Sequence, residues 1–322
     1  MNVMITGAAG FIGGYLAAHC INEGSRVLGI DIAEPPGRSA IGDFELCDVR
    51  DSERLSDLIS KFRPRRIFHL AAQSHPVVSL QQPRETIDIN VSGTVSLFES
   101  LRATGITALV LVACSSAEYG LVAEHDSPVK EGHPLNPLHP YGVSKVAQDL
   151  LAAQYFANYA IPTIRIRIFK TTGPGKLDEV CSDLAKRAVE IELGIRPPSL
   201  PVGNLTSRRS IVDVRDLVPA LYLAADHCLI GDVYNLGGDD VLSVQAVIEE
   251  IRKQMTVPFT VEQRPDLIRS CDEPITVGDN SKFRNRCAWT PSISFAATLH
   301  DMLEWWRTRL TASFQHASAR RA

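Results

Sequence analysis

The sequence of 322 residues predicts an α/β protein, in which a doubly wound parallel sheet is joined to a smaller α/β domain. Three observations predict this fold class. Short apolar runs alternate with amphipathic stretches in the first half, a glycine-rich segment follows the first apolar run, and Gly and Pro gather beyond residue 169. Strands that alternate with helices in this way form a parallel sheet covered on both faces.

The alternation can be followed along the chain as far as residue 168. We expect strands at residues 3–5, 26–30, 44–46, 66–70, 108–113 and 163–168. The amphipathic stretches predict helices at residues 11–22, 52–62, 86–104 and 143–159. Because helices of this length separate most of the strands, neighbouring strands can run parallel through helical crossovers.

The rhythm of strands and helices weakens after Phe169, where loops such as Gly173-Pro174-Gly175 begin. We therefore assign residues 1–169 plus about 211–240 to the larger domain. The smaller, substrate-binding domain takes about 170–210 plus 241–310. Residues 311–322 are small and polar, so we expect a flexible tail there.

Composition narrows the class of protein. The net charge is -4, so no basic surface favours nucleic acid or an anionic membrane. No apolar stretch reaches the length of about 18 residues that a membrane span needs. The seven cysteines are scattered without a Cys-x-x-Cys pair, which argues against a disulfide framework and a metal site. We expect a cytoplasmic protein in a reducing compartment.

The first chemical signal is the glycine-rich segment, which follows a strand and opens a helix. Gly7, Gly10 and Gly13 lie three residues apart, so backbone N–H groups and the helix N-terminus can approach a diphosphate. Asp31 ends the second strand, where its carboxylate can bind ribose hydroxyls and repel a 2′-phosphate. Together these residues predict an NAD site, although a purely structural turn is the alternative and Arg38 could weaken the preference for NAD.

A second position near the sheet edge points to the same cofactor. Asp48 and Val49 follow the third apolar run, where they could contact an adenine ring. An Asp that caps a turn explains the same residues equally simply.

The second chemical signal is a tyrosine and a lysine four residues apart. Tyr141 and Lys145 share one helix face, so the ammonium can favour the phenolate, lower its pKa and hold a ribose hydroxyl. A phenol tuned in this way can exchange a proton with an alcohol. Ser115 ends a strand at the carboxyl edge of the sheet, where its hydroxyl can bond the reacting oxygen. An exposed helix pair and a structural serine are the alternatives.

The order of these motifs resembles the extended short-chain dehydrogenase/reductases that act on nucleotide sugars, which contain a Rossmann fold. The resemblance spans residues 1 to about 310, and its most telling stretches are as follows: Gly7-x-x-Gly10-x-x-Gly13, Asp31, His69-Leu70-Ala71-Ala72-Gln73-Ser74, Asn90-Val91-x-Gly93-Thr94, Ser115-Ser116, Pro140-Tyr141-Gly142-x-Ser144-Lys145, Gly173-Pro174-Gly175 and Asp213-Val214-Arg215-Asp216. Within the family, three stretches are most similar to the GDP-mannose 4,6-dehydratase and GDP-4-keto-6-deoxy-mannose reductase branch: Ala72-Gln73-Ser74-His75, Ser116-Ala117-Glu118-Tyr119-Gly120 and Gly278-Asp279-Asn280-Ser281-Lys282.

The resemblance implies roles for matching residues. Tyr141 would be the general acid/base, Lys145 its partner and Ser115 the hydroxyl that polarises the sugar oxygen, while Asn90 would support Lys145 through water. The implied cofactor contacts are Gly7, Gly10, Phe11, Ile12, Gly13, Asp31, Ile32, Asp48, Val49, Leu70, Ala71, Ala72, Tyr141 and Lys145. The implied substrate contacts are Ser74, Ser116, Ala117, Lys170 and Arg209, of which Arg209 would meet the diphosphate. Family members commonly form homodimers through helices near residues 86–104 and 143–159.

Three departures from the family pattern limit what the resemblance implies. Dehydratases place an acidic residue where this chain has Ala117, and Glu118, one position later, would reach the sugar only through a local bulge. Lys170 replaces a neutral amide, which suggests an anionic substrate group. Ser210 replaces a carboxylate that usually follows the arginine.

We therefore expect an NAD-dependent epimerase that acts at sugar C4 of a GDP- or UDP-linked sugar through a 4-keto intermediate. The alternative is a 4-reductase of the GDP-4-keto-6-deoxy-mannose type or a C4 oxidase, because both use the same three residues. A 4,6-dehydratase fits less well without an acid at Ala117. A catalytically silent NAD-binding redox regulator is the alternative from another class, although Ser115, Tyr141 and Lys145 are all present.

Overall fold

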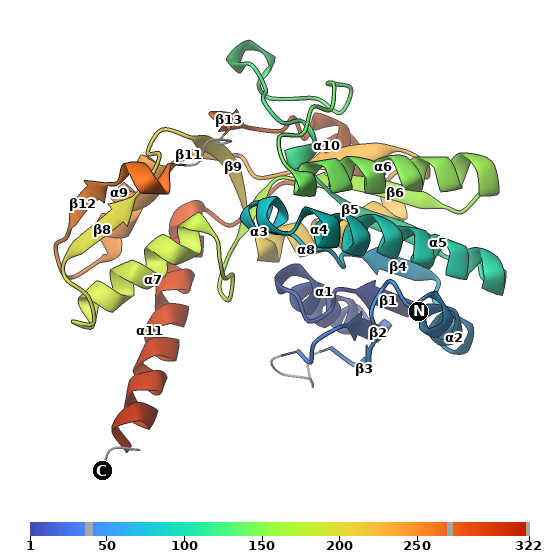
Figure 1. The fold of residues 1–322 in the computed structure, drawn as a ribbon, viewed down its shortest axis with the longest axis horizontal. Coiled ribbons are helices and arrows are strands. Elements are labelled where there is room, and N and C mark those ends of the chain that lie inside the picture. Colours follow the sequence, from blue (N-terminus) through green and yellow to red (C-terminus); the bar gives the residue numbers. More distant parts are fainter. Residues whose placement is uncertain (36–40, 269–272, 320–322) are drawn as a thin grey trace.

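The protein is described by a computed structural model that covers residues 1–35, 41–268 and 273–319. Its larger part is built on a seven-stranded sheet in which every neighbouring pair is parallel (Figure 1). The order is β10-β6-β5-β4-β1-β2-β3. The strands are β1 (Asn2–Thr6), β2 (Arg26–Asp31), β3 (Asp43–Leu46), β4 (Arg66–His69), β5 (Leu109–Ser115), β6 (Thr163–Ile168) and β10 (Val233–Leu236). The predicted doubly wound parallel sheet is confirmed.

Helices cover both faces of this sheet because its strands are apolar on both sides. One face packs against α1 (Phe11–Asn22), α8 (Val214–His227) and α10 (Ser281–Cys287). The other packs against α2 (Ser52–Phe62), α5 (Gly93–Thr104) and α6 (Pro140–Tyr159). The middle strands are buried almost throughout, which is typical of a doubly wound parallel sheet.

The helix expected at residues 86–104 is interrupted in the structure. Two short helices, α3 (Pro76–Gln81) and α4 (Pro83–Ile87), lead into a π-helical turn at Asp88–Ser92, after which α5 begins at Gly93. The inserted turn directs the Asn90 side chain to Gln73 and to Ser144 of α6. The periodicity of apolar residues does not predict such a turn, because π-helical turns are rare, single-turn insertions within α-helices.

The second part of the protein lies beside the carboxyl edge of the large sheet (Figure 1). Its four-stranded sheet contains β7 (Lys170–Thr172), β9 (Arg208–Asp213), β11 (Asp240–Ser243) and β13 (Ile275–Thr276). A separate pair is formed by β8 (Ser199–Val202) and β12 (Thr260–Gln263). The helices α7 (Val180–Glu192), α9 (Val244–Gln254) and α11 (Phe295–Ala319) share an apolar core.

Two boundaries differ from our expectations. The segment assigned to the larger domain from residue 211 begins in the second sheet, because β9 continues to Asp213. Helix α11 continues to Ala319, so the expected tail is helical as far as this residue and residues 320–322 lie outside the described ranges. Among the helices of the described ranges, none is long and apolar enough to cross a membrane.

Candidate active site

A cleft with a volume of about 1300 Å³ separates the two parts of the protein. One wall is formed by the loops that follow β1, β2, β3, β4 and β5, together with the first turns of α1 and α6. The opposite wall is formed by residues of β7, α7, β8 and β9. Every residue that we expected to contact cofactor or substrate lines this cleft. Ligands of doubly wound sheets bind at this edge.

The glycine-rich segment has the backbone that a dinucleotide cradle requires. Gly7 has a φ of +73°, a left-handed conformation that favours glycine. A Cβ on Gly13 would lie 2.1 Å from the Gly7 carbonyl oxygen, so only glycine lets α1 start this close to the loop. Gly10 forms the exposed N-cap of α1 and leaves the helix N-terminus open to the cleft. These residues fit the diphosphate of a dinucleotide.

The two candidate carboxylates beside the cradle have different environments. Asp31 accepts hydrogen bonds from the backbone N–H groups of Ala9 (3.0 Å), Ile32 (2.7 Å) and Ala33 (3.3 Å), so it holds the glycine-rich segment to β2. A carboxylate offers about four acceptor positions, which leaves room for a ribose hydroxyl. Asp48 is paired with Arg50 at 2.6 Å, and hydrogen bonds from this arginine lower the pKa of Asp48. Arg38 lies outside the described residues.

Helix α6 brings the proposed catalytic tyrosine and lysine to the end of β5. The His139 ring accepts a hydrogen bond from the Gly142 N–H at 3.0 Å, and Pro140 occupies the first helical position, so the start of α6 is fixed. The Lys145 ammonium lies 5.9 Å from the centre of the Tyr141 ring and donates to the Ala113 carbonyl at 2.9 Å. The lysine therefore links α6 to β5.

Burial dominates the protonation of these groups. It raises the pKa of Tyr141 to about 12, although a hydrogen bond with Ser115 opposes this shift. Burial also lowers the pKa of Lys145 to about 8. The shift of Tyr141 is opposite in direction to our expectation, because the cost of burying a phenolate exceeds the stabilisation from its neighbours.

On the opposite wall of the cleft, Lys170 is paired with a carboxylate of the protein itself. Its ammonium forms an ion pair of 2.8 Å with Glu179, a buried carboxylate that also caps the N-terminus of α7. The charge that we expected to face an anionic substrate is therefore matched within the protein. Arg209 lines the same wall, where its guanidinium lies 3.7 Å from Glu273.

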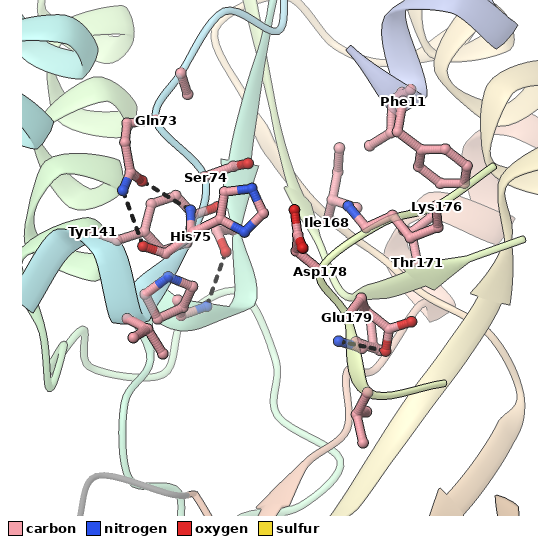
Figure 2. Close-up of a pocket in the computed structure, with 18 of the residues that line it drawn as sticks. Phe11, Gln73, Ser74, His75, Tyr141, Ile168, Thr171, Lys176, Asp178 and Glu179 are labelled. Atoms are coloured by element: carbon pink, nitrogen blue, oxygen red, sulfur yellow. Dashed lines mark hydrogen bonds and ion pairs between the residues drawn. The ribbon is translucent and has the colours of Figure 1, made fainter. Parts of the chain in front are cut away.

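Three cleft residues, Lys176, Asp178 and Glu179, did not stand out in the sequence. Figure 2 shows Gln73, Ser74 and His75 with Tyr141 on one side of the cleft, and Lys176, Asp178 and Glu179 on the other. The Gln73 side chain bonds the backbone of His75 in both directions, at 2.8 and 3.1 Å. Isolated polar residues in loops carry no periodic signal, so only their tertiary placement identifies them.

The structure gives Asn90 direct contacts and places Glu118 away from the cleft. The Asn90 amide is bonded to the Gln73 backbone and to the Ser144 hydroxyl, so it anchors the loop that contains Gln73 to α6. Glu118 lies on a single helical turn, Ser116–Glu118, with its side chain fully buried behind the cleft. The bulge that could have brought Glu118 to the sugar is absent in this described segment.

Comparisons with known proteins agree with this geometry. Residues 4–302 match the family described as GDP-mannose 4,6 dehydratase. GDP-6-deoxy-D-mannose reductase of Pseudomonas aeruginosa is 26% identical over 309 residues, which cover 96% of this chain and 98% of the reductase.

Solved structures resemble both the fold and the chain length. UDP-glucose 4-epimerase of Thermus thermophilus, solved with NAD, has a TM-score of 0.85 and 25% identity, and the match covers 95% of this chain and 99% of the epimerase. MoeE5, solved with UDP-glucuronic acid and NAD, has a TM-score of 0.84 and 28% identity, with coverage of 96% and 100%. The family and fold class expected from the sequence are confirmed.

Proposed function

Because the chain belongs to the GDP-mannose 4,6 dehydratase family, we propose that it is an NAD-dependent epimerase that acts at sugar C4 of a nucleotide sugar. One observation carries this proposal: Ser115, Tyr141 and Lys145 line the same cleft as the glycine-rich cradle. NAD held by that cradle would supply a nicotinamide that accepts a hydride and returns it. Asp31, which would repel a 2′-phosphate, favours NAD over NADP.

The protein's own residues supply the proton chemistry. Tyr141 takes the proton of the sugar 4-hydroxyl during oxidation and gives it back during reduction, while Ser115 donates a hydrogen bond to the same oxygen. Lys145 holds the cofactor ribose and stabilises negative charge on Tyr141. An epimerase must also let the 4-keto sugar turn over in the site, and a cleft of about 1300 Å³ leaves room for that motion.

Dehydration fits the cleft less well. Removal of water across C5 and C6 needs an acid or base beside the sugar. Ala117 lines the cleft without a titratable group, and Glu118 is buried with its carboxylate bonded to the Ser115 N–H and paired with Arg167. We therefore infer hydride transfer at C4 without elimination of water.

The second wall is the proposed site of the nucleotide diphosphate and sugar. Arg209 would meet the diphosphate, and Ser74, Ser116, Ala117 and Lys170 would surround the sugar. The Lys170 ammonium is paired with the Glu179 carboxylate, so it does not by itself require an anionic sugar. Nucleotide-linked neutral sugars and uronic acids should therefore both be assayed as substrates. UDP-glucuronic acid is bound to the similar protein MoeE5.

Assembly and location form part of the same proposal. The helices near residues 86–104 and 143–159 expose apolar side chains suited to a homodimer: Ile87, Val143, Leu150, Phe156 and Tyr159. We place residues 1–169 plus about 211–240 in an NAD-binding domain, and about 170–210 plus 241–310 in a substrate-binding domain. We place the protein in the cytoplasm, where it would serve carbohydrate biosynthesis.

One incubation tests the epimerase proposal. The purified protein, loaded with NAD and freed of excess cofactor, is mixed with GDP- and UDP-linked hexoses, and the sugars are identified by NMR. We expect a C4 epimer without net change in NAD(H). Stoichiometric consumption of NADH or NAD would contradict the proposal.

A 4-reductase is the second candidate. The similarity to GDP-6-deoxy-D-mannose reductase over nearly the whole chain favours it, since a reductase uses the same three residues. It would consume one reduced cofactor for each 4-keto sugar, so a parallel incubation with NADH and a GDP- or UDP-linked 4-keto sugar separates the two functions.

A further inference from the structure

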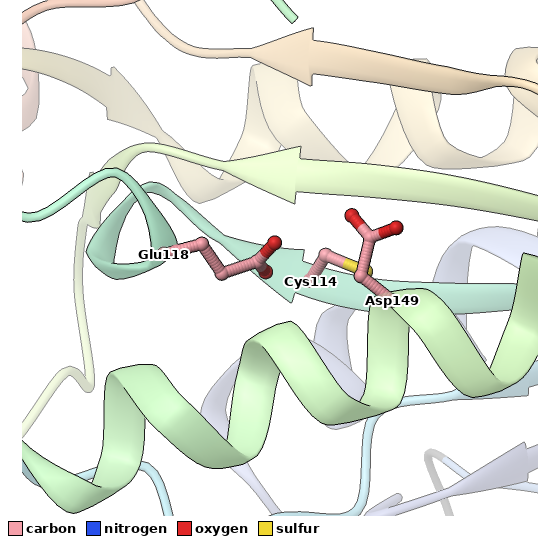
Figure 3. Close-up of side chains that lie close together, drawn as sticks. All are labelled: Cys114, Glu118 and Asp149. Atoms are coloured by element: carbon pink, nitrogen blue, oxygen red, sulfur yellow. The ribbon is translucent and has the colours of Figure 1, made fainter. Parts of the chain in front are cut away.

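Behind the proposed reaction centre lies a buried cluster of charged side chains. Glu118, Asp149 and Arg167 are almost inaccessible to solvent, with side-chain exposures of 0%, 0% and 6%. Figure 3 shows Glu118, Cys114 and Asp149 close together between β5 and α6. Buried charges are costly, so a cluster that adjoins the catalytic residues calls for a role beyond packing.

The cluster continues the catalytic face of α6. Tyr141, Lys145 and Asp149 are spaced four residues apart and therefore lie on one side of this helix. Asp149 accepts from Arg165 at 2.7 Å and from Arg167 at 2.9 Å, both on β6. Although the Cys114, Glu118 and Asp149 ligand atoms lie within 4.8 Å of one another, these guanidinium groups already supply the positive charge.

Glu118 connects this cluster to Ser115. One of its carboxyl oxygens accepts a hydrogen bond of 2.7 Å from the Ser115 N–H, while the other lies 3.2 Å from the Arg167 Nε. The Ser115 hydroxyl accepts from the Ala117 N–H at 3.2 Å, so the turn is closed from both ends. The Arg167 Nε–H donates to Asp149 instead, so within the described residues the second carboxyl oxygen of Glu118 accepts no hydrogen bond.

We propose that Glu118 is a positioning residue, which fixes the backbone of Ser115 from behind and places a carboxyl in the buried cluster that continues the face of α6 carrying Tyr141 and Lys145. This inference depends on the proposed function only through hydride transfer, a step that epimerase, reductase and oxidase share. Glu118 is absent from the cleft lining, so it acts through Ser115.

Glu118 and its charged neighbours shift one another's pKa values. Burial and the neighbouring Asp149 raise the pKa of Glu118 to about 8, whereas Arg167 lowers it. The other titratable and charged groups around this cluster are Cys114 on β5, Arg165 on β6, Lys145 and Tyr141 on α6, and Tyr119, whose hydroxyl accepts from Arg167 at 2.9 Å. When ionised, Glu118 raises the pKa of both Tyr141 and Lys145. Removal of this charge should lower both pKa values.

Two substitutions separate the hydrogen bond from the charge. Glu118→Gln keeps a carbonyl oxygen for the Ser115 N–H but cannot ionise, whereas Glu118→Ala removes both functions. Glu190→Gln is the matched control, since Glu190 is a buried, paired glutamate of α7 that does not line the cleft. The assays are the single-turnover rate of hydride transfer and the steady-state kcat and KM, each followed against pH with NAD and the nucleotide hexose that the wild type oxidises fastest.

We expect Glu118→Gln to keep a rate within about twofold of wild type at pH 6.5 and to move the alkaline limb down by roughly 0.5 pH unit. We expect Glu118→Ala to lower kcat by about tenfold or more at every pH, with KM little changed. The control should match the wild type in both respects. An unshifted alkaline limb in Glu118→Gln, or an unchanged kcat in Glu118→Ala, would overturn the proposal.

A second measurement does not depend on activity. Amide hydrogen exchange of the peptide covering residues 109–120 should be faster in Glu118→Ala than in the wild type, and unchanged in Glu118→Gln. Equal exchange in all three proteins would also overturn the proposal. A failure to find an epimer in the product, by contrast, bears only on the proposed function.

Discussion

The glycine at the start of α1 allows a quantitative test of the cofactor cradle. In Gly13→Ala, the new Cβ would meet the Gly7 carbonyl oxygen at 2.1 Å and the Ala8 Cα at 2.8 Å, both in the backbone of the loop. Backbone atoms cannot rotate away as a flexible side chain can, so the loop or α1 must shift. The loop that moves is the one proposed to hold the diphosphate of NAD.

The neighbouring glycine provides the matched control. In Gly14→Ala, the nearest atom to the new Cβ is 3.9 Å away, which is an ordinary contact. Alanine is favoured over glycine inside a helix by about 1 kcal/mol, so both variants share this gain. Overpacking typically costs about 1–3 kcal/mol. The expected net result is a loss of up to about 2 kcal/mol for Gly13→Ala, against no loss or a small gain for Gly14→Ala.

Two assays are needed, because stability and cofactor binding should change together. Thermal unfolding reports the stability of each variant, and isothermal titration calorimetry with NAD reports affinity. We expect Gly13→Ala to weaken NAD binding about tenfold, equivalent to about 1.4 kcal/mol, while Gly14→Ala binds like the wild type. Equal NAD affinity in the two variants would refute the assignment of this loop as the cradle.

Three further predictions concern the reaction centre and the second wall. Tyr141→Phe should lower kcat by about 100-fold or more while NAD still binds, as measured by steady-state kinetics and calorimetry; an active variant would exclude Tyr141 as the acid/base. Because burial lowers the pKa of Lys145 to about 8, the ammonium is lost as pH rises through 8. NAD affinity should therefore fall about tenfold between pH 7 and 9.5, whereas in Lys145→Met it should be weak and independent of pH. Lys170→Met should destabilise the protein by about 2–4 kcal/mol, because it leaves the buried Glu179 carboxylate unpaired. This loss of stability should become smaller as pH falls, because Glu179 is then protonated, and the double variant Lys170→Met/Glu179→Gln should regain stability. Equal unfolding temperatures of Lys170→Met and the double variant would contradict this prediction.

The elements of the large sheet could be predicted because they are specified locally. Helix α2 and strand β6 begin and end where the sequence pattern places them, since Asp51 caps α2 and the apolar run Thr163–Ile168 is bounded by loop residues. The parallel order follows from the helical crossovers. The residues expected at the cleft also lie there, because the carboxyl ends of parallel strands meet at one edge.

Pairings between distant residues could not be predicted from the pattern. Lys170 and Glu179 lie nine positions apart across a loop, so the sequence showed a cation but not the carboxylate that neutralises it. Glu118 was expected to follow the alternation of a strand, whereas the turn at Ser116–Glu118 ends the strand and buries the side chain. The raised pKa of Tyr141 likewise reflects tertiary burial, which no spacing of residues reveals.

The central claim is that the cleft transfers a hydride from sugar C4 and returns it to the same carbon. A GDP- or UDP-linked hexose with deuterium at C4 tests this most directly, with the NAD-loaded protein and the products followed by NMR and mass spectrometry. We predict a C4 epimer that retains deuterium at C4, with no deuterium in free cofactor. Deuterium that is lost to solvent or accumulates in released cofactor would contradict the claim.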